Sequence, residues 1–444
     1  MRITIKDKNN FILMFNEMFY DNTISQINGI TIDSRKIEKN DLFIPIKGEN
    51  YDGHDFIDDA IKKGALLCFS EKKSNIKNRK VIKVRLIQNL INQFASMWQK
   101  KSKAQVIGIT GSNGKTTTKE LLYSFLSKKY QCSKTKGNFN SLIGLPLTYL
   151  NSKTNDDFNI LEYGASRPNE IDKLCKIVKP DYGLITNISE SHIENYSSFN
   201  QLKKTKSALY MNLIDNNIAF INNEINYLAD LKLNCKKITF GFDKTSDYKA
   251  HEIQKGNNKY IKVNNNLVSI PRSLYHLKEN ILSAYSIANH FKINHKDIND
   301  CLKYYIVPQG RGNKIKLGKL NIIDDSYNAN PESVKLAINR FNTIKTSGKK
   351  IFILGDMLEL GNNSNKNHIE IAKIIEKSKI NIVITFGDIS KNTTDSIKNK
   401  NIKTIHYYSD QLLDLKNQIN KIATENDLIY LKGSRSMKLE RVYK

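Results

Sequence analysis

The sequence predicts an α/β protein of three domains. Short apolar runs rich in β-branched residues alternate with segments of helical spacing over most of the chain, which is typical of mostly parallel sheets. The 444 residues, 39% of them hydrophobic, are enough for two to four domains with cores of their own. We place a small α/β domain at 1–85, a central domain at 86–307 and a C-terminal domain at 308–444.

Each domain is predicted from its own elements. The first mixes short strands and helices around residues 31–65, TIDSRKIEKNDLFIPIKGENYDGHDFIDDAIKKGA. The strands expected in the central domain are 105–110, 159–163, 182–187 and 218–222, with a helix over 116–129. The strands expected in the C-terminal domain are 320–324, 350–354, 382–386, 404–408 and 427–431, with helices over 331–341 and 368–377. This second alternation predicts a Rossmann-like unit.

A glycine-containing loop, GITGSNGKTTTKE, joins the first central strand to the helix that follows it. Such a loop can turn its N–H groups around phosphate oxygens at the positive end of a helix, which predicts a P-loop ATPase-like domain. The strict P-loop spacing fails, so we expect Gly111 and Gly114 to be the working glycines. Lys115 would reach the β and γ phosphates of ATP, and Thr116 would hold Mg²⁺. A glycine-rich turn that binds nothing is the alternative.

Composition excludes several other classes of protein. No apolar run approaches the roughly 20 residues that cross a bilayer, and the first residues lack a signal-peptide core, so we expect a soluble cytoplasmic protein. The five cysteines are odd in number and widely spaced, which predicts reduced thiols. The formal charge of +26 comes from lysines spread along the chain, without the basic and aromatic clusters of a nucleic-acid site.

Two polar side chains follow neighbouring strands of the central domain. Glu162 ends the strand expected at 159–163, and His192 follows the strand expected at 182–187. Sites in open α/β sheets lie at the carboxyl ends of strands, so both are candidates to face the phosphate loop. Glu162 suits Mg²⁺, whereas a histidine is an unusual ligand of Mg²⁺ and is more often a loop residue with ordinary partners.

Together with the phosphate loop, several further motifs resemble the Mur ligase family over almost the whole chain. They are GNFNSLIGLPLT at 137–148, LEYGA at 161–165, TNISESHIEN at 186–195, IIDDSYNANPES at 322–333, ILGDMLELG at 353–361 and KGSRSMKLERV at 432–442. The fourth and fifth are specific to the branch that adds D-alanyl-D-alanine to UDP-N-acetylmuramoyl-tripeptide. The loop alone would not separate that branch from other ligases of the family.

The resemblance implies an ATP-dependent amide ligase that acts through an acyl phosphate, at the last cytoplasmic step of peptidoglycan precursor synthesis. The terminal phosphate of ATP would go to the carboxylate of the tripeptide, and the dipeptide amine would then displace it. Lys115 would stabilise the phosphoryl group, while Thr116, Glu162 and His192 would bind two Mg²⁺ ions. Lys206 would be carbamylated and would also serve the metal. The family usually has an acidic residue where this chain has Ala208, and a plain solvated lysine remains the alternative.

Further roles follow from the resemblance alone. Residues expected to bind ATP are Thr110, Gly111, Ser112, Asn113, Gly114, Lys115, Thr116, Thr117, Asn280, Arg311 and Asp325. Residues expected to bind the two other substrates are Ser34, Arg35, Lys47, Asn138, Asn140, Tyr327, Asn328 and Asn330. Ordinary explanations stay open for some of these: a capping turn for Ser34 and Arg35, turn chemistry for Asn138 and Asn140, and a polar helix surface for Asn280.

The expected partners are therefore small molecules. They are ATP, UDP-N-acetylmuramoyl-tripeptide and D-alanyl-D-alanine, bound by a monomer that neither contacts nucleic acid nor inserts into a membrane. Two other functions remain open at this point. One is an amino-acid-adding ligase of the same family, and the other is a non-catalytic protein that binds nucleotides or nucleic acid.

Overall fold

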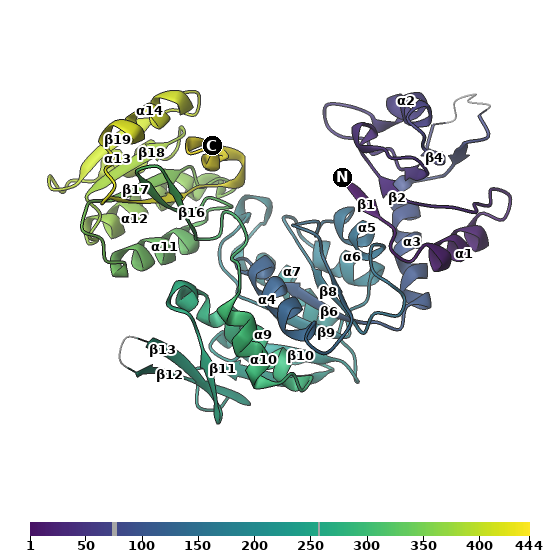
Figure 1. The fold of residues 1–444 in the computed structure, drawn as a ribbon, viewed down its shortest axis with the longest axis horizontal. Coiled ribbons are helices and arrows are strands. Elements are labelled where there is room, and N and C mark those ends of the chain that lie inside the picture. The colour runs from purple at the N-terminus through teal and green to yellow at the C-terminus, as the bar shows by residue number, and fades with distance from the viewer. Residues whose placement is uncertain (73–77, 256–257) are drawn as a thin grey trace. The chain divides into compact units, whose positions relative to one another are not determined.

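Three sheets form the framework of the chain, and most of their neighbouring strands are parallel, which confirms the predicted α/β class. The computed structural model describes residues 1–72, 78–255 and 258–444 (Figure 1). These residues group into two compact units. One contains 1–165, 169–187 and 204–303, and the other contains 166–168, 188–203 and 304–444.

The first sheet belongs to the N-terminal region and has the strand order β1-β2-β3-β4-β5. Its strands are β1 (Arg2–Thr4), β2 (Gly29–Thr31), β3 (Asp41–Phe43), β4 (Leu67–Ser70) and β5 (Val81–Lys83). The helices of this part of the chain are α1 (Lys8–Met18), α2 (Ile57–Lys62) and α3 (Ile87–Lys101). β1 is antiparallel to β2, and the remaining neighbours are parallel.

Helix α3 connects the first sheet to the central one through a buried aromatic face. The Phe94 ring centroid lies 5.8 Å from that of Phe11 on α1 and 6.1 Å from that of Phe69 on β4. One turn later, the Trp98 indole donates a hydrogen bond of 3.1 Å to Ser152 Oγ in the central region. Both α3 side chains are fully buried, so this helix fastens the small sheet onto the central domain.

Phe94→Ala is expected to lower the free energy of unfolding by about 3–5 kcal/mol, because it removes a ring from a packed aromatic cluster and leaves a cavity. Urea unfolding followed by fluorescence will measure the loss, since Trp98 is the only tryptophan of the chain. Gln93→Ala is the matched control on the exposed side of the same helix, with an expected change below about 0.5 kcal/mol. Equal stability of the two variants would contradict this role of the cluster.

The central sheet has the order β14-β13-β12-β11-β10-β9-β6-β8-β7. Its strands are β6 (Gln105–Thr110), β7 (Cys132–Lys134), β8 (Phe158–Glu162), β9 (Tyr182–Ile185), β10 (Ile218–Asn222), β11 (Lys236–Gly241), β12 (Tyr248–Lys255), β13 (Asn258–Val263) and β14 (Asn266–Ser269). Its helices are α4 (Lys115–Leu126), α5 (Gly144–Tyr149), α6 (Glu170–Ile177), α7 (Phe199–Met211), α8 (Asn226–Ala229), α9 (Lys278–His290) and α10 (His295–Lys303).

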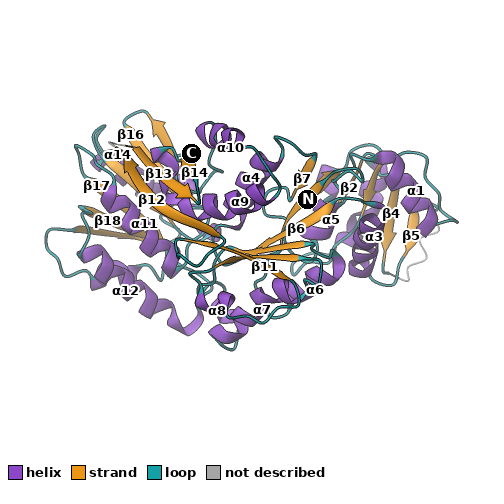
Figure 2. Cartoon of the chain, turned by 90° about the horizontal axis from the view of Figure 1, so that it is seen from below, coloured by secondary structure: helices purple, strands orange, loops and turns teal. Residues whose placement is uncertain are grey.

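The strand that leads into the phosphate loop lies inside this sheet. β6 pairs in parallel with β8 on one side and β9 on the other, so the carboxyl ends of all three strands meet at one edge. Helices α4, α9 and α10 cover one face of the sheet, and α6 and α8 lie on the other (Figure 2). The predicted strand 182–187 ends early, at Ile185, and the predicted helix 116–129 begins at Lys115 and ends at Leu126.

The third sheet has the order β15-β16-β20-β17-β18-β19, with β15 antiparallel to β16 and the other neighbours parallel. Its strands are β15 (Asn313–Leu317), β16 (Leu320–Asp325), β17 (Lys350–Gly355), β18 (Ile382–Phe386), β19 (Lys403–Tyr407) and β20 (Leu428–Lys432). Its helices are α11 (Pro331–Thr343), α12 (Ser364–Glu376), α13 (Lys391–Ser396) and α14 (Leu412–Ile422). Alternate residues of β17 pack on α11 and α12 or on α14, which gives two cores, one on each face.

Candidate active site

The phosphate loop spans the gap between β6 and α4 and uses two glycines with positive φ. Gly111 has a φ of 143° and Gly114 a φ of 81°, a region that favours glycine. A Cβ atom at Gly111 would lie 2.0 Å from Thr186 Oγ1, and one at Gly114 would lie 2.3 Å from Asn280 Nδ2. Other residues at these positions would therefore displace the loop from the groups that pack against it.

Thr186 and Asn187, which directly follow β9, form hydrogen bonds with the backbone of this loop. Thr186 Oγ1 donates to the carbonyl of Asn113 at 2.6 Å, and the N–H of Asn113 donates to Asn187 Oδ1 at 2.9 Å. The N–H of Ser112 donates to the carbonyl of Asn187 at 3.0 Å. Thr186 and Asn187 were not among the predicted site residues, although their place at the carboxyl end of a parallel strand is a signal for a role there.

The first turn of α4 carries the two side chains expected at the phosphates. Lys115 Nζ donates to the carbonyl of Gly111 at 2.7 Å and to that of Ser112 at 3.3 Å, so its ammonium group lies over the loop. Thr116 and Thr117 follow it and are buried. Backbone N–H groups at a helix start, together with a cation, form a site suited to an anion such as a phosphate.

Asn280 packs against the same loop from α9. Its side-chain amide donates to Thr118 Oγ1 at 3.0 Å and to the carbonyl of Gly114 at 3.5 Å. The alternative of a polar surface residue is therefore wrong, because Asn280 is partly buried and bonded to the start of α4. Its expected contact with adenine stays a prediction.

Glu162 lies at the end of β8 and is fully buried. In the parallel pairing of β8 with β6, Glu162 is opposite Ile109. Ile109 is the residue before Thr110, where β6 ends and the phosphate loop begins. Asn140 Nδ2 donates to Glu162 Oε2 at 3.3 Å, and Lys119 Nζ lies 3.1 Å from Oε1 as an ion pair without hydrogen-bond alignment. No group in the described part of the chain donates a hydrogen bond to this buried Oε1.

These oxygen atoms fit a magnesium ion. Mg²⁺ prefers carboxylate, hydroxyl and phosphate oxygens, and it usually takes only one or two ligands from the protein. The carboxylate of Glu162 and the hydroxyl of Thr116 offer oxygen atoms of this kind. The described residues contain no cluster of three or more His, Cys, Asp or Glu side chains that could hold a metal ion.

Lys206 lies on α7 and is only 1% exposed, so the alternative of a solvated lysine is wrong. Burial, which is the largest cause, and the positive charge of Lys115 together lower the pKa of its ammonium group to about 7, although Glu170 opposes the shift. A substantial fraction of its amine is therefore neutral near pH 7. A neutral amine is the form that can react with CO₂.

His192 belongs to the second unit and lies at the start of a 3₁₀ turn, Ile193–Asn195. Its φ is 55°, and its Nδ1 atom lies 2.5 Å from Glu359 Oε2. This contact lowers the pKa of Glu359. Glu359 stands in the GDMLELG motif but had no assigned role, and a carboxylate of this kind commonly orients a histidine ligand.

Arg311 and Asp325, which are expected to bind ATP, both lie in the second unit and contact other residues of that unit. The Arg311 guanidinium lies 3.9 Å from the centroid of the Tyr327 ring, which is a cation–π geometry. Asp325 Oδ2 lies 2.9 Å from Lys432 Nζ and accepts a hydrogen bond of 3.1 Å from the Tyr430 hydroxyl. Neither Lys432 nor Tyr430 was among the predicted site residues.

The two asparagines expected at the dipeptide differ in their surroundings. Asn330 caps α11, because its Oδ1 accepts a hydrogen bond of 2.8 Å from the N–H of Ser333. The hydroxyl of Ser333 accepts the N–H of Asn330 in return at 3.0 Å, which completes a capping box. Asn328 is partly buried two residues earlier. The capping role of Asn330 is structural and had not been expected.

The candidates for the UDP-substrate lie on the first sheet's loops. Asp33 accepts the N–H of Arg35 at 3.2 Å and pairs with its guanidinium at 2.8 Å, so Ser34 and Arg35 do form the capping turn that was kept as an alternative. Ser34 is buried, whereas the Arg35 side chain is 84% exposed. Lys47 is exposed and bridges to Asp52 through the backbone.

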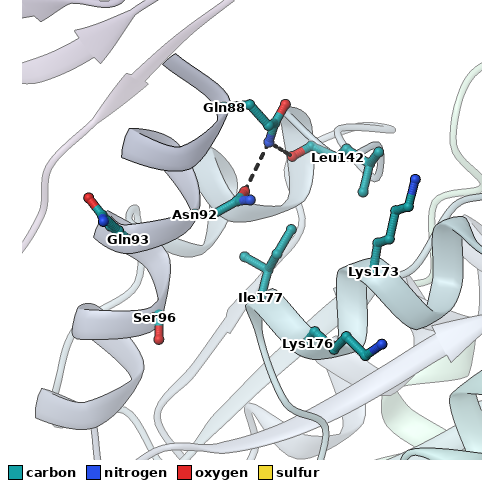
Figure 3. Close-up of a pocket in the computed structure, with 8 residues that line it drawn as sticks. All are labelled: Gln88, Asn92, Gln93, Ser96, Leu142, Lys173, Lys176 and Ile177. Atoms are coloured by element: carbon teal, nitrogen blue, oxygen red, sulfur yellow. Dashed lines mark hydrogen bonds between the residues drawn. The ribbon is translucent and has the colours of Figure 1, made fainter. Parts of the chain in front are cut away.

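A cavity of about 500 Å³ lies between α3 and α6. Gln88 Nε2 donates to the carbonyl of Leu142 at 3.0 Å and to Asn92 Oδ1 at 2.9 Å at one side of this cavity (Figure 3). The residues that line it are Gln88, Asn92, Gln93, Ser96, Leu142, Lys173, Lys176 and Ile177. None of them was predicted for the site, and the cavity lies outside it.

All five cysteines are free thiols, as the sequence predicts. In the described part of the chain, no helix is long and apolar enough to cross a membrane.

Sequence models of three Mur ligase domains match the chain. The Mur ligase family catalytic domain matches residues 26–111, the Mur ligase middle domain matches 109–291, and the glutamate ligase domain of Mur ligases matches 310–435.

Similar proteins match over nearly the full length. The UDP-N-acetylmuramoyl-tripeptide–D-alanyl-D-alanine ligase of Bacillus subtilis is 35% identical, over 96% of this chain and 94% of its own. The ligase of the same name from Buchnera aphidicola subsp. Baizongia pistaciae is 38% identical, over 93% of this chain and 91% of its own. The crystal structure of a MurF ligase from Thermotoga maritima in complex with ADP is similar with a TM-score of 0.80, at 27% identity, covering 93% of this chain and 95% of that one.

Proposed function

The chain belongs to the Mur ligase family, and we propose on this premise that it joins D-alanyl-D-alanine to UDP-N-acetylmuramoyl-tripeptide with cleavage of ATP. The observation that carries the proposal is the 35% identity to the Bacillus subtilis ligase over 96% of the chain. The phosphate loop and the ADP-bound Thermotoga relative support the use of ATP. The reaction would complete a peptidoglycan precursor in the cytoplasm, where ATP and UDP-activated sugars are made.

The chemistry begins at the tripeptide's terminal carboxylate, which is a poor acyl donor because its charge is delocalised and oxide is a poor leaving group. Transfer of the γ-phosphoryl group makes it an acyl phosphate, and attack by the dipeptide amine then forms the amide and releases phosphate. The first step brings two anions together, and the second needs the neutral amine aligned with the acyl carbon, so the protein's task is to neutralise charge and to align the reacting groups.

We assign the phosphate side of this task to the loop. The N–H groups of residues 110–117 would surround the phosphates, and Lys115 would move from the carbonyls of Gly111 and Ser112 to the γ-phosphate. Thr116, Glu162 and His192 would hold two Mg²⁺ ions. When bound, these ions would supply positive charge to the phosphoryl group in transfer. Glu359 would keep the imidazole of His192 in one orientation.

Lys206 would act as its carbamate. Its full burial beside Lys115 supports this role, since a carbamate at this place would return negative charge to a site crowded with cations. The carbamate would thus align Lys115 or a metal ion with the phosphoryl group. Trapping with ¹³CO₂ and NMR of the folded protein would detect it directly.

The remaining candidates are assigned to substrates. Asn280, Arg311 and Asp325 would contact the nucleoside or phosphates of ATP. Ser34, Arg35 and Lys47 would bind the uridine diphosphate, and Asn138 and Asn140 the muramoyl peptide. Tyr327, Asn328 and Asn330 would line the dipeptide site. We also propose that residues 1–85, 86–307 and 308–444 act as three domains of one monomer, since one chain supplies every assigned residue.

The proposal is tested by the product. Pure protein with ATP, Mg²⁺ and UDP-N-acetylmuramoyl-tripeptide is expected to release phosphate only when D-alanyl-D-alanine is added, and mass spectrometry should show the pentapeptide product. D-alanine, L-lysine and meso-diaminopimelate are the control amines. Phosphate release with a single amino acid and none with the dipeptide would instead identify an amino-acid-adding ligase.

A further inference from the structure

Lys119 is a buried lysine that lies between Glu162 and the segment 135–140. Lys119 stands on α4, one turn after Thr116, and its side chain is completely buried. A buried ammonium group is unfavourable unless anions and hydrogen-bond acceptors surround it. Its surroundings therefore show which groups it holds.

Four oxygen atoms surround the Lys119 ammonium group. It donates to the carbonyl of Thr135 at 2.7 Å and to that of Gly137 at 3.0 Å. The other two are carboxylate oxygens, Glu162 Oε1 at 3.1 Å and Glu120 Oε1 at 3.1 Å. One cation thus contacts the proposed Mg²⁺ ligand and the backbone that enters the GNFN segment.

The same two parts of the chain meet at three more contacts. The N–H of Glu162 donates to Thr135 Oγ1 at 2.9 Å, and Asn140 Nδ2 donates to Glu162 Oε2 at 3.3 Å. The N–H of Gly164 donates to the carbonyl of Asn140 at 2.9 Å. A Cβ atom at Gly164 would lie 2.5 Å from Asn140 Oδ1, so the two segments approach closely. Glu162 and residues 135–140 therefore form one hydrogen-bonded assembly with Lys119 at its centre.

We propose that Lys119 is a positioning residue that fixes the carboxylate of Glu162 and the muramoyl-peptide segment 135–140 in one arrangement. The inference rests on the proposed function for the identity of the two ligands. Asn140 Nδ2 donates to Glu162 Oε2, and Lys119 Nζ forms an ion pair with Oε1 at 3.1 Å, so the two groups together hold the orientation of the carboxylate. Binding of the peptide substrate at 135–140 and of Mg²⁺ at Glu162 would then depend on the same cation.

Lys119→Met tests this, because it keeps the length of the side chain and removes only the charge and the donors. We expect the Mg²⁺ concentration for half-maximal activity to rise about 10-fold, and kcat to fall about 10- to 100-fold. In calorimetry without ATP or metal, the affinity for UDP-N-acetylmuramoyl-tripeptide should fall about 10-fold, while metal-free ADP should bind with less than about a 2-fold change.

Lys134→Met is the matched control. Lys134 also pairs with Glu120, but it lies on β7 and contacts neither Glu162 nor the carbonyls of residues 135 and 137 among the described contacts. The control should keep the wild-type Mg²⁺ dependence and tripeptide affinity. Should Lys119→Met not fold, Lys119→Gln, which keeps a donor for the carbonyls but no charge, is measured in the same way.

The outcomes separate the two proposals. If Lys119→Met or the Gln variant retains the wild-type Mg²⁺ dependence and tripeptide affinity, or matches Lys134→Met, the positioning role is wrong. A uniform loss of activity together with a lower Tm, without a change in either dependence, would also overturn it. If the wild type binds the tripeptide and ADP but joins no dipeptide, the proposed function fails, while the two calorimetric measurements still decide the role of Lys119.

Discussion

Lys206→Ala is expected to lower kcat by about 1,000-fold while leaving the fold intact, because it removes the group proposed to become a carbamate beside Lys115. Steady-state phosphate release measures this loss. Acetate or formate should restore part of the activity, since a short carboxylate can enter the space left by the side chain and replace the missing negative charge. Lys204→Ala, on the exposed side of the same helix, is the control and should retain wild-type activity.

The pH dependence of carbamylation follows from the pKa of Lys206, which burial and the charge of Lys115 lower to about 7. Only the neutral amine reacts with CO₂. In the free enzyme about one-tenth of Lys206 should be neutral at pH 6, and most of it at pH 8. The carbamate signal in ¹³C NMR should therefore grow from pH 6 to pH 8 at constant dissolved CO₂. Full activity of Lys206→Ala, without any effect of added carboxylates, would remove the carbamate from the mechanism.

Lys115→Met should have the second large effect, a fall in kcat of roughly 100- to 1,000-fold, because it removes a cation from the phosphoryl group in transfer. It should also raise the pKa of Lys206, since the positive charge of Lys115 is one of the causes that lower it. Less carbamate should then form at pH 7, and the same ¹³C NMR measurement will show it.

The control for this variant is Lys128→Met, just beyond the end of α4, where the side chain is exposed. It should change neither kcat nor the carbamate signal. An unchanged pKa of Lys206 in Lys115→Met would show that burial alone sets it. A kcat within about 10-fold of the wild type would contradict the assignment of Lys115 to the phosphates.

Much of the fold could be predicted from apolar runs. The predicted strands 218–222 and 382–386 match β10 and β18 at both ends, because a strand buried on both faces is a continuous apolar run. The antiparallel strands β12 to β14 were not predicted. Lysine and asparagine interrupt the apolar residues there, as in NKYIKV of β13, and in a lysine-rich chain such a segment looks like any exposed one.

Site residues could be predicted where a sequence motif coincides with the end of a strand. They could not be predicted where their role depends on burial in the folded protein. The positions of Lys115, Thr116 and Glu162 follow from the order of strand, loop and helix. Nothing in TTTKE marks Lys119 as buried among the 70 Lys and Arg residues, because three of its four oxygen partners come from residues 16 to 43 positions further along the chain. The burial of Lys206 likewise depends on packing that the sequence does not express.

The outermost strands of the central sheet have a consequence for the protein in a crowded cell. β7 at one edge has three residues and β14 at the other has four, and both carry polar side chains. Long, flat edge strands invite another chain to continue the ladder, and brief polar ones discourage it. The edges of the central sheet therefore give the strands of other copies little backbone to pair with. We expect this to limit aggregation of the protein during synthesis.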